Sequence, residues 1–307
     1  WCPDGYYLAS RPNFTFDPLF HAGCYYVQEA SSMFVCQALR QYVDADRPLT
    51  VLDMCAAPGG KSTAVLSMLP EGSVMICNEP IRQRAQVLAE NMHKWGNPNT
   101  IVTNNYPDDY ARLDLNFDLI ICDVPCSGEG MFRKDEGAVG EWSVQNVEKC
   151  RTLQREIVDK VWPLLRPGGL MVYSTCTFNT REDEENVDWI CREHDAELLP
   201  VVTQDEWHIT PSLLKGFDSP VYRFIPGRTL GEGIFMAVLR KGGEPNSVDV
   251  EHAKRKERKV KKMKSKEKTT KSSGANGLSW LDGRDAFTVV GDKDVYYAVS
   301  NALMPVY

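Results

Sequence analysis

Val51-Leu-Asp-Met-Cys-Ala-Ala-Pro-Gly-Gly-Lys61 runs from a short apolar strand, through a loop with two adjacent glycines, into the start of a helix. This order is typical of the first βαβ unit of a doubly wound sheet, in which the loop lines the ligand crevice. Gly59 and Gly60 would let the backbone approach a ligand closely, and the helix behind them begins with unpaired N–H groups. The segment therefore predicts a ligand site at the end of the first strand.

From residue 50 to about residue 241, β-branched runs alternate with amphipathic stretches. This alternation favours βαβ units in a mostly parallel sheet. The predicted strands cover residues 50–54, 73–77, 100–103, 117–122 and 170–174, followed by an antiparallel pair at 221–224 and 233–239. The predicted helices cover residues 26–42, 61–68, 81–94, 144–165 and 181–194. We therefore predict an α/β fold with a Rossmann-like sheet of seven strands.

The ends of the chain differ from this central part. The chain begins at Trp1 rather than at Met and stops at Tyr307 directly after strand-like sequence, so we expect a piece of a longer protein. The predicted organisation is an N-terminal segment at 1–48, which is the tail of an incomplete domain, and a catalytic domain at 49–242. A basic linker at 243–275 and the beginning of an incomplete C-terminal domain at 276–307 follow.

Composition excludes several classes of protein. No apolar run approaches the roughly 18 to 20 residues that span a bilayer, and no signal peptide is recognisable, so we expect a cytoplasmic protein with no membrane partner. The ten cysteines are then expected to be reduced thiols, and those within strand runs, such as Cys77 and Cys122, to be small core residues. Without C-x-x-C spacing, and with five scattered histidines, the sequence does not indicate a metal site.

The net charge of −7 is unevenly distributed. Residues 252–271 hold eleven Lys or Arg against two Glu, a local charge of +9, which leaves −16 for the rest of the chain. Such a run is either a solvated linker or a segment that contacts nucleic acid, and composition favours neither.

The glycine loop matches neither common phosphate-binding motif. A P-loop requires a first glycine where Cys55 stands, and G-x-G-x-x-G is absent. A cofactor with an amino-acid part and a nucleoside but no phosphate groups remains, and S-adenosylmethionine meets this description. Glu79, at the end of the second strand, stands where an acidic side chain binds ribose hydroxyls, although a lone Glu there is usually an ordinary surface carboxylate.

Two cysteines lie at the ends of two further strands. Asp123 and Cys126 follow the run from Phe117, and Cys176 follows the run from Leu170. Because the carboxyl ends of parallel strands line one crevice, both thiols should face the glycine loop. Thr180 is the expected N-cap of the next helix, whose N-terminus would lower the pKa of the Cys176 thiol. A buried inert thiol is the usual alternative, and Cys126 could also serve only the turn.

Three segments together resemble the signature motifs of the NOL1/NOP2/Sun family of RNA 5-methylcytosine methyltransferases. They are Asp53-Met-Cys-Ala-Ala-Pro-Gly-Gly-Lys61, Asp123-Val-Pro-Cys-Ser-Gly128 and Tyr173-Ser-Thr-Cys-Thr177. Gly23-Cys-Tyr-Tyr-Val-Gln-Glu-Ala-Ser-Ser-Met33 is similar to a family segment upstream of the catalytic core. Cys126-Ser-Gly-Glu-Gly-Met-Phe-Arg-Lys-Asp135 resembles the bacterial RsmF-type branch, which methylates small-subunit ribosomal RNA. The resemblance covers about residues 20–242.

The resemblance implies a class I S-adenosylmethionine-dependent methyltransferase that acts on RNA, with 16S ribosomal RNA or the small subunit as partner. Cys176 would attack cytosine C6, Cys126 would help to release the product, and Asp123 would touch the cofactor or the base. The C-terminal domain would bind RNA, and a monomer is favoured. The residues implied to hold the cofactor are Cys55, Ala56, Ala57, Pro58, Gly59, Gly60, Lys61 and Glu79.

One departure from the family pattern concerns the adenine end of the cofactor site. The family usually offers an acidic residue after the third strand, whereas this chain has Val102-Thr-Asn-Asn-Tyr106. We expect Asn105 to be a neutral hydrogen-bonding substitute. Two other functions stay open: a methyltransferase that acts on protein or a small molecule, and a non-catalytic RNA-binding assembly factor.

Overall fold

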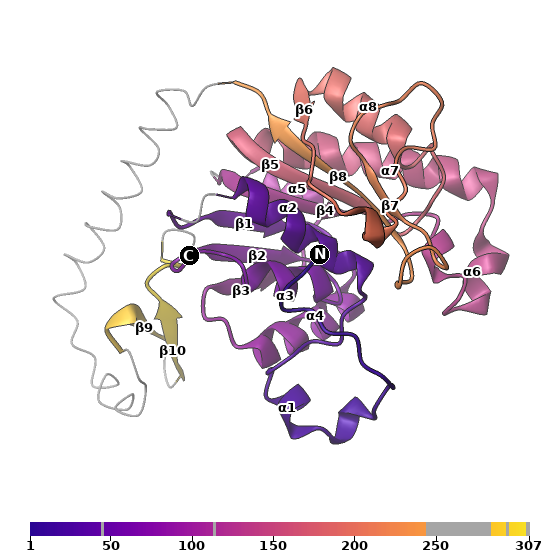
Figure 1. Cartoon of the computed structure of the whole chain (residues 1–307). Helices are drawn as coiled ribbons and strands as arrows, with labels where there is room; N and C mark the ends of the chain where they lie inside the picture. Colours follow the sequence, from indigo (N-terminus) through magenta and orange to yellow (C-terminus); the bar gives the residue numbers. More distant parts are fainter. Residues whose placement is uncertain (44–45, 113–114, 244–283, 293–294, 305–307) are drawn as a thin grey trace.

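A central β-sheet with helices on both faces makes up most of the protein (Figure 1). The structure is a computed structural model that describes residues 1–43, 46–112, 115–243, 284–292 and 295–304. The strands of the central sheet are β1 (Thr50–Asp53), β2 (Val74–Asn78), β3 (Thr100–Thr103), β4 (Phe117–Asp123), β5 (Leu165–Thr175), β6 (Ala196–Leu198), β7 (Tyr222–Phe224) and β8 (Ile234–Lys241).

The strand order is β3-β2-β1-β4-β5-β8-β6, with β7 also paired to β8. The first five strands run parallel to their neighbours, and β8 runs antiparallel to β5. The two short strands share the other edge of β8: β7 pairs with its first half and β6 with its last residues. The predicted α/β class and the antiparallel pair are confirmed, but the sheet has eight strands rather than seven. With three residues, β6 is too short to show a periodic pattern.

The helices are α1 (Pro18–His21), α2 (Phe34–Tyr42), α3 (Gly60–Leu66), α4 (Arg82–Trp95), α5 (Pro107–Tyr110), α6 (Glu136–Glu141), α7 (Val144–Val161) and α8 (Glu184–Glu193). The helix predicted at 144–165 ends early, because Trp162–Leu164 forms a 3-10 turn that contains Pro163. The helix predicted at 26–42 begins only at Phe34, after a 3-10 turn at Ser31–Met33.

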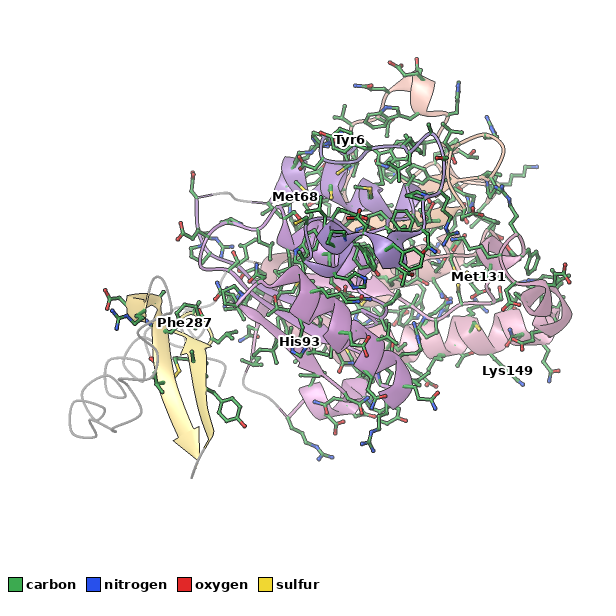
Figure 2. All side chains as sticks on the ribbon, turned by 90° about the horizontal axis from the view of Figure 1, so that it is seen from below. Tyr6, Met68, His93, Met131, Lys149 and Phe287 are labelled. Carbon is green, nitrogen blue, oxygen red and sulfur yellow. The ribbon has the colours of Figure 1, made fainter. Side chains whose placement is uncertain are left out.

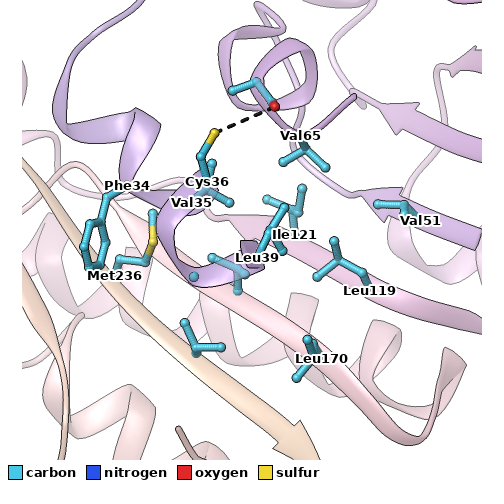
Figure 3. Packing of buried hydrophobic residues seen from close by; sticks show 14 of the residues in the cluster. Phe34, Val35, Cys36, Leu39, Val51, Val65, Leu119, Ile121, Leu170 and Met236 are labelled. Carbon is cyan, nitrogen blue, oxygen red and sulfur yellow. Dashed lines mark hydrogen bonds between the residues drawn. The ribbon is translucent and has the colours of Figure 1, made fainter. Parts of the chain in front are cut away.

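The strands present alternate residues to two separate cores. Val51 and Leu119 face the side covered by α2, α3 and α4, whereas Leu52 and Ile120 face the side of α7 and α8. Strands that are buried on both faces explain why the sequence shows continuous apolar runs there rather than alternation. Figure 3 shows the first core, in which Phe34, Val35, Cys36 and Leu39 of α2 pack against Val51, Val65, Leu119, Ile121, Leu170 and Met236.

The N-terminal segment packs on the outer strands. The Trp1 ring meets Phe224 edge-on at 5.1 Å and Trp207 at 5.9 Å, and its Nε1 donates to the Ala30 carbonyl at 2.7 Å. This contact holds the segment next to residues 23–33, from which Gln28 reaches the glycine loop of the candidate site.

A second, two-stranded sheet lies at the C-terminal end, marked by Phe287 in Figure 2. It consists of β9 (Phe287–Asp292) and β10 (Val295–Ser300), so the strand-like sequence there does form strands. Ser300 Oγ donates to Asn99 Oδ1 at 2.5 Å and joins this hairpin to the residue before β3. The basic run at 252–271 lies outside the described residues. The predicted domain boundaries stay predictions.

Candidate active site

Four acidic or thiol side chains meet at the carboxyl edge of the parallel strands. Asp53 ends β1, Glu79 follows β2, Asp123 ends β4 and Cys176 follows β5. The registers of β1 with β2 and β4, and of β4 with β5, bring these strand ends level. The sheet thus places the predicted site residues along one edge, with the acids of β1 and β2 on one side and the thiols on the other.

The two predicted catalytic thiols are in direct contact. Cys126 Sγ lies 3.2 Å from Cys176 Sγ, and both residues are half-buried. The hydrogen bond from Cys126 lowers the pKa of the Cys176 thiol, and the charge of Lys61 acts in the same direction against the effect of burial. The same hydrogen bond, together with burial, raises the pKa of the Cys126 thiol. Of the two thiols, Cys176 is therefore the one whose surroundings favour the thiolate form.

This origin of the low Cys176 pKa differs from the predicted one. We expected the N-terminus of the following helix to lower it, with Thr180 as the N-cap. The helix α8 begins at Glu184, its N-cap is Asp183, and residues 177–183 separate it from the thiol. The predicted Thr180 cap is therefore wrong, and the Cys176 pKa is lowered by the Cys126 thiol after β4 and by Lys61 on α3.

Lys61, at the start of α3, contacts the acid at the end of β4. Its Nζ donates to Asp123 Oδ2 at 2.8 Å, and Ser174 Oγ donates to Asp123 Oδ1 at 2.7 Å. The neighbouring Asp123 carboxylate raises the pKa of Lys61 although burial opposes this. A charged ammonium group from the start of α3 and a carboxylate from the end of β4 are thus held side by side, next to the thiol pair.

Asp53 is a buried acid with one free oxygen. Ser62 Oγ donates to its Oδ2 at 2.7 Å, whereas Oδ1 has no hydrogen-bond partner among the described residues. Burial raises the pKa of Asp53 to about 7, and nearby Asp123 adds to this effect. An unpartnered buried oxygen usually marks a site that a ligand completes.

Glu79 is also buried and incompletely paired. Its Oε1 accepts from the Ile81 N–H at 3.0 Å, and Arg84 Nη1 lies 3.2 Å from Oε2. That contact lacks hydrogen-bond geometry, so Oε2 has no hydrogen-bond partner in the described part of the chain. Arg84 also donates to the Ala57 carbonyl at 3.0 Å and joins Glu79 to the glycine loop. The carboxylate oxygens of Asp53 and Glu79 that accept no hydrogen bond suit the ammonium and ribose groups of the expected cofactor.

The glycine loop is held by the N-terminal segment and α4. Gly59 has φ +110°, and a Cβ there would lie 2.7 Å from Met92 Cε. Gln28 Nε2 donates to the Gly60 carbonyl at 2.7 Å, and Asn91 donates to the Pro58 carbonyl at 2.8 Å. We expected the two glycines to permit approach of a ligand, but the structure shows protein atoms packed against them. Of the other loop residues, Ala56 and Ala57 are buried and Cys55 is partly buried.

Asn105 is placed beside Glu79 by its backbone rather than by its side chain. Asn78 Oδ1 accepts from the Asn105 N–H, and Asn78 Nδ2 donates to the Asn105 carbonyl, both at 3.0 Å. The neighbouring Asn104 donates to the carbonyls of Glu79 and Pro80. Asn78, which holds this corner together, was not predicted from sequence, because a polar residue within an apolar strand gives no separate signal.

Sequence reasoning also missed the residues that hold the thiol loops together. Ser127 Oγ lies 3.1 Å from Thr177 Oγ1, and the Gly130 N–H donates to the Cys176 carbonyl at 2.7 Å. Glu182 is fully buried and accepts from the Ser127 N–H. The signal in the sequence was a run of acidic residues directly after the Cys176 segment, but its burial could not be foreseen.

Known proteins match this chain over most of its length. Residues 41–240 match the family of 16S rRNA methyltransferases RsmB/F, and residues 1–30 match the N-terminal domain of 16S rRNA methyltransferase RsmF. The chain belongs to the RsmB/F methyltransferase family. Ribosomal RNA small subunit methyltransferase F of Cronobacter sakazakii is 34% identical over 252 residues, which cover 78% of this chain and 50% of that protein.

Other relatives and solved structures are also similar to this chain. The methyltransferase F of Escherichia coli O6:H1 is 35% identical, again over 78% of this chain and 50% of the relative, so the chain spans about half the length of these proteins. NSun6 from Pyrococcus horikoshii with SFG, an S-adenosylmethionine analogue, matches with a TM-score of 0.65 and 28% identity, over 76% of this chain and 57% of that one. The expected cofactor, S-adenosylmethionine, is confirmed for the RsmB/F fold.

The described residues were also searched for a metal site and for membrane-spanning helices. These residues contain no group of three metal-binding side chains that could hold a metal ion. None of their helices has the length and apolar character that crossing a bilayer requires.

Proposed function

We propose that this chain methylates C5 of cytosine in small-subunit ribosomal RNA through a covalent bond between Cys176 and C6. The observation that carries the proposal is the contact of two thiols at the carboxyl edge of the sheet. The pKa of Cys176 is lowered and that of Cys126 is raised. Relatives named ribosomal RNA small subunit methyltransferase F support the RNA substrate. A ribosomal substrate also favours the expected cytoplasmic location.

The cofactor would be held by the β1–β2 side of the crevice. The loop at 55–61 and the free oxygens of Asp53 and Glu79 fit its amino-acid part and its ribose, and Asn105 fits the adenine end. When bound, S-adenosylmethionine supplies an electrophilic methyl group. The chain's own residues then have to make cytosine C5 nucleophilic, because it is a weak nucleophile in the free base.

Cytosine would be recognised by the pair of Lys61 and Asp123. The hydrogen-bonding edge of the base offers an amino donor and the acceptors N3 and O2, which match a carboxylate and an ammonium group held 2.8 Å apart. Uracil carries an acceptor in place of the amino group and would face the lone pairs of Asp123. A base within folded RNA must leave its stack to reach this edge.

The thiols would act in sequence. The Cys176 thiolate adds to C6, which saturates the 5,6 bond and makes C5 able to accept the methyl group. The C5 proton is then removed and the Cys176–C6 bond breaks, with the electron pair returning to sulfur. Cys126 is placed to assist this release, because its thiol lies beside the sulfur that leaves.

The experiment that tests this function uses labelled S-adenosylmethionine with isolated small subunits, naked 16S rRNA, protein and no acceptor. We expect label in RNA, recovered as 5-methylcytidine after digestion, and its loss in Cys176→Ala. Cys191→Ala is the matched control, since Cys191 is another half-buried thiol, on α8. Label recovered in another nucleoside, or in protein alone, would contradict the proposal.

A further inference from the structure

The buried carboxylate of Glu182 lies between the two loops that carry the thiols. Its side chain is fully buried, two residues before the start of α8. Oε1 accepts from Ser127 Oγ at 2.5 Å and from Asn179 Nδ2 at 2.8 Å. Oε2 accepts from the Ser127 N–H at 3.0 Å and from Gln154 Nε2 at 2.7 Å. Both oxygens are therefore occupied by donors from three different parts of the chain.

These donors flank Cys126 on both sides. Ser127 follows it directly, and Gln154 Nε2 also donates to the carbonyl of Pro125, directly before it, at 2.9 Å. Asn179 belongs to the loop after Cys176 and shares its amide with Thr177 at 3.0 Å. One carboxylate thus fixes the backbone around one thiol and the loop around the other.

The next two acids, Asp183 and Glu184, have a different partner. Asp183 and Glu184 are also fully buried, but both pair with Arg223, at 3.0 Å and 2.8 Å. Glu184 also accepts from the Leu213 N–H at 2.8 Å. Of these three acids, Glu182 is the one whose hydrogen bonds, within the described part of the chain, reach the segment that carries Cys126.

We propose that Glu182 is a positioning residue that holds the Cys126 thiol against Cys176, so that product release depends on its carboxylate. The inference rests on the proposed function for its catalytic consequence, but the geometry can be tested without RNA. An amide at this position offers one acceptor oxygen and places an NH₂ group against donors, so the Cys126 loop should lose its fixed position.

The test measures how fast diamide, which takes up two electrons and two protons, joins Cys126 and Cys176 in a disulfide, with the pair identified by peptide mapping. We expect Glu182→Gln to slow this reaction by about tenfold or more, because hydrogen bonds to a charged group hold the loop. Glu184→Gln is the matched control, with the same burial and the same substitution, and should react at the wild-type rate. Ser127→Ala, which removes one of the four bonds, should be intermediate.

A wild-type crosslinking rate in both Glu182→Gln and Ser127→Ala overturns the inference, as does equal slowing in Glu184→Gln. The catalytic consequence is read separately: Glu182→Gln should accumulate a covalent protein–RNA species in the way that Cys126→Ala does, whereas Glu184→Gln should not. If Cys126→Ala forms no such species, the proposed function fails while the crosslinking result still decides the role of Glu182. Should Glu182→Gln not fold, Ser127→Ala carries the test.

Discussion

At the scale of single residues, Glu79 follows β2 and belongs to the proposed cofactor site. Glu79→Gln keeps the shape of the side chain and removes its charge, so S-adenosylmethionine should bind more weakly, by about 1.5 to 3 kcal/mol for the charge-assisted hydrogen bonds that are removed. Isothermal calorimetry measures this change, and the exposed Glu90→Gln on α4 is the control. Equal affinity in wild type and Glu79→Gln would remove Glu79 from the site.

Asp53 should make stability depend on pH. Burial raises its pKa to about 7, whereas the unfolded chain releases this proton near its ordinary value of 3.8. Between about pH 4 and pH 7 the folded state keeps the Asp53 proton that the unfolded chain has released. The free energy of unfolding should therefore fall as pH rises from about 4 to 7, by on the order of a few kcal/mol. Urea unfolding should show that the stability of wild type falls relative to that of Asp53→Asn as pH rises through this range. Parallel curves would mean that Asp53 has the same pKa in the folded and unfolded chains.

The sequence predicts where the proposed reacting residues lie, but not the residues that hold them in place. Cys126, Cys176, Glu79 and Asp123 stand at strand ends, where a parallel sheet gathers them in one place. Glu182 and Asn78 act through buried hydrogen bonds across distant parts of the chain, and such contacts have no local pattern.

At the scale of elements, buried strands were the most predictable part of the fold. The runs at β1, β2, β4 and β5 are apolar on both faces because helices cover both, which makes them recognisable without periodicity. Helix ends were less predictable. The acids at 182–184 suit a helix N-terminus, but two of them pair with Arg223 from β7, a partner that lies about forty residues away.

The ion pairs of Arg223 should matter for stability far more than surface pairs do. Arg223→Met leaves Asp183 and Glu184 buried without a counter-charge, which should lower the free energy of unfolding by about 3 to 5 kcal/mol. Arg240→Met is the control, because Arg240 also stacks on a ring but pairs with exposed Glu197, and it should cost about 0 to 1 kcal/mol. Denaturant unfolding that showed the same destabilisation in both variants would contradict this account of the pair.

At the scale of the whole molecule, the charge distribution separates a basic run from an otherwise acidic protein. Neutralising Lys259, Lys261, Lys262 and Lys264 should weaken RNA binding and flatten its salt dependence. Every lysine–phosphate interaction that the substitutions remove should reduce the log–log slope by roughly 0.7 to 0.9. Binding measured over a range of salt concentrations tests this, and an identical slope in both proteins would make the run a solvated linker.

In the proposed mechanism, Cys176 bonds to the RNA base and Cys126 is needed to release it. Cys126→Ala removes the hydrogen bond that lowers the Cys176 pKa, so addition of Cys176 to C6 should be slower. The variant should still add Cys176 to C6 and transfer the methyl group, but should stall before release. Incubated with 16S rRNA and S-adenosylmethionine, it should give a slowly migrating protein–RNA band on a denaturing gel, and the band should vanish when Cys176 is also replaced by Ala. A Cys126→Ala protein that turns over normally without this band, or a band that persists without Cys176, would contradict the account.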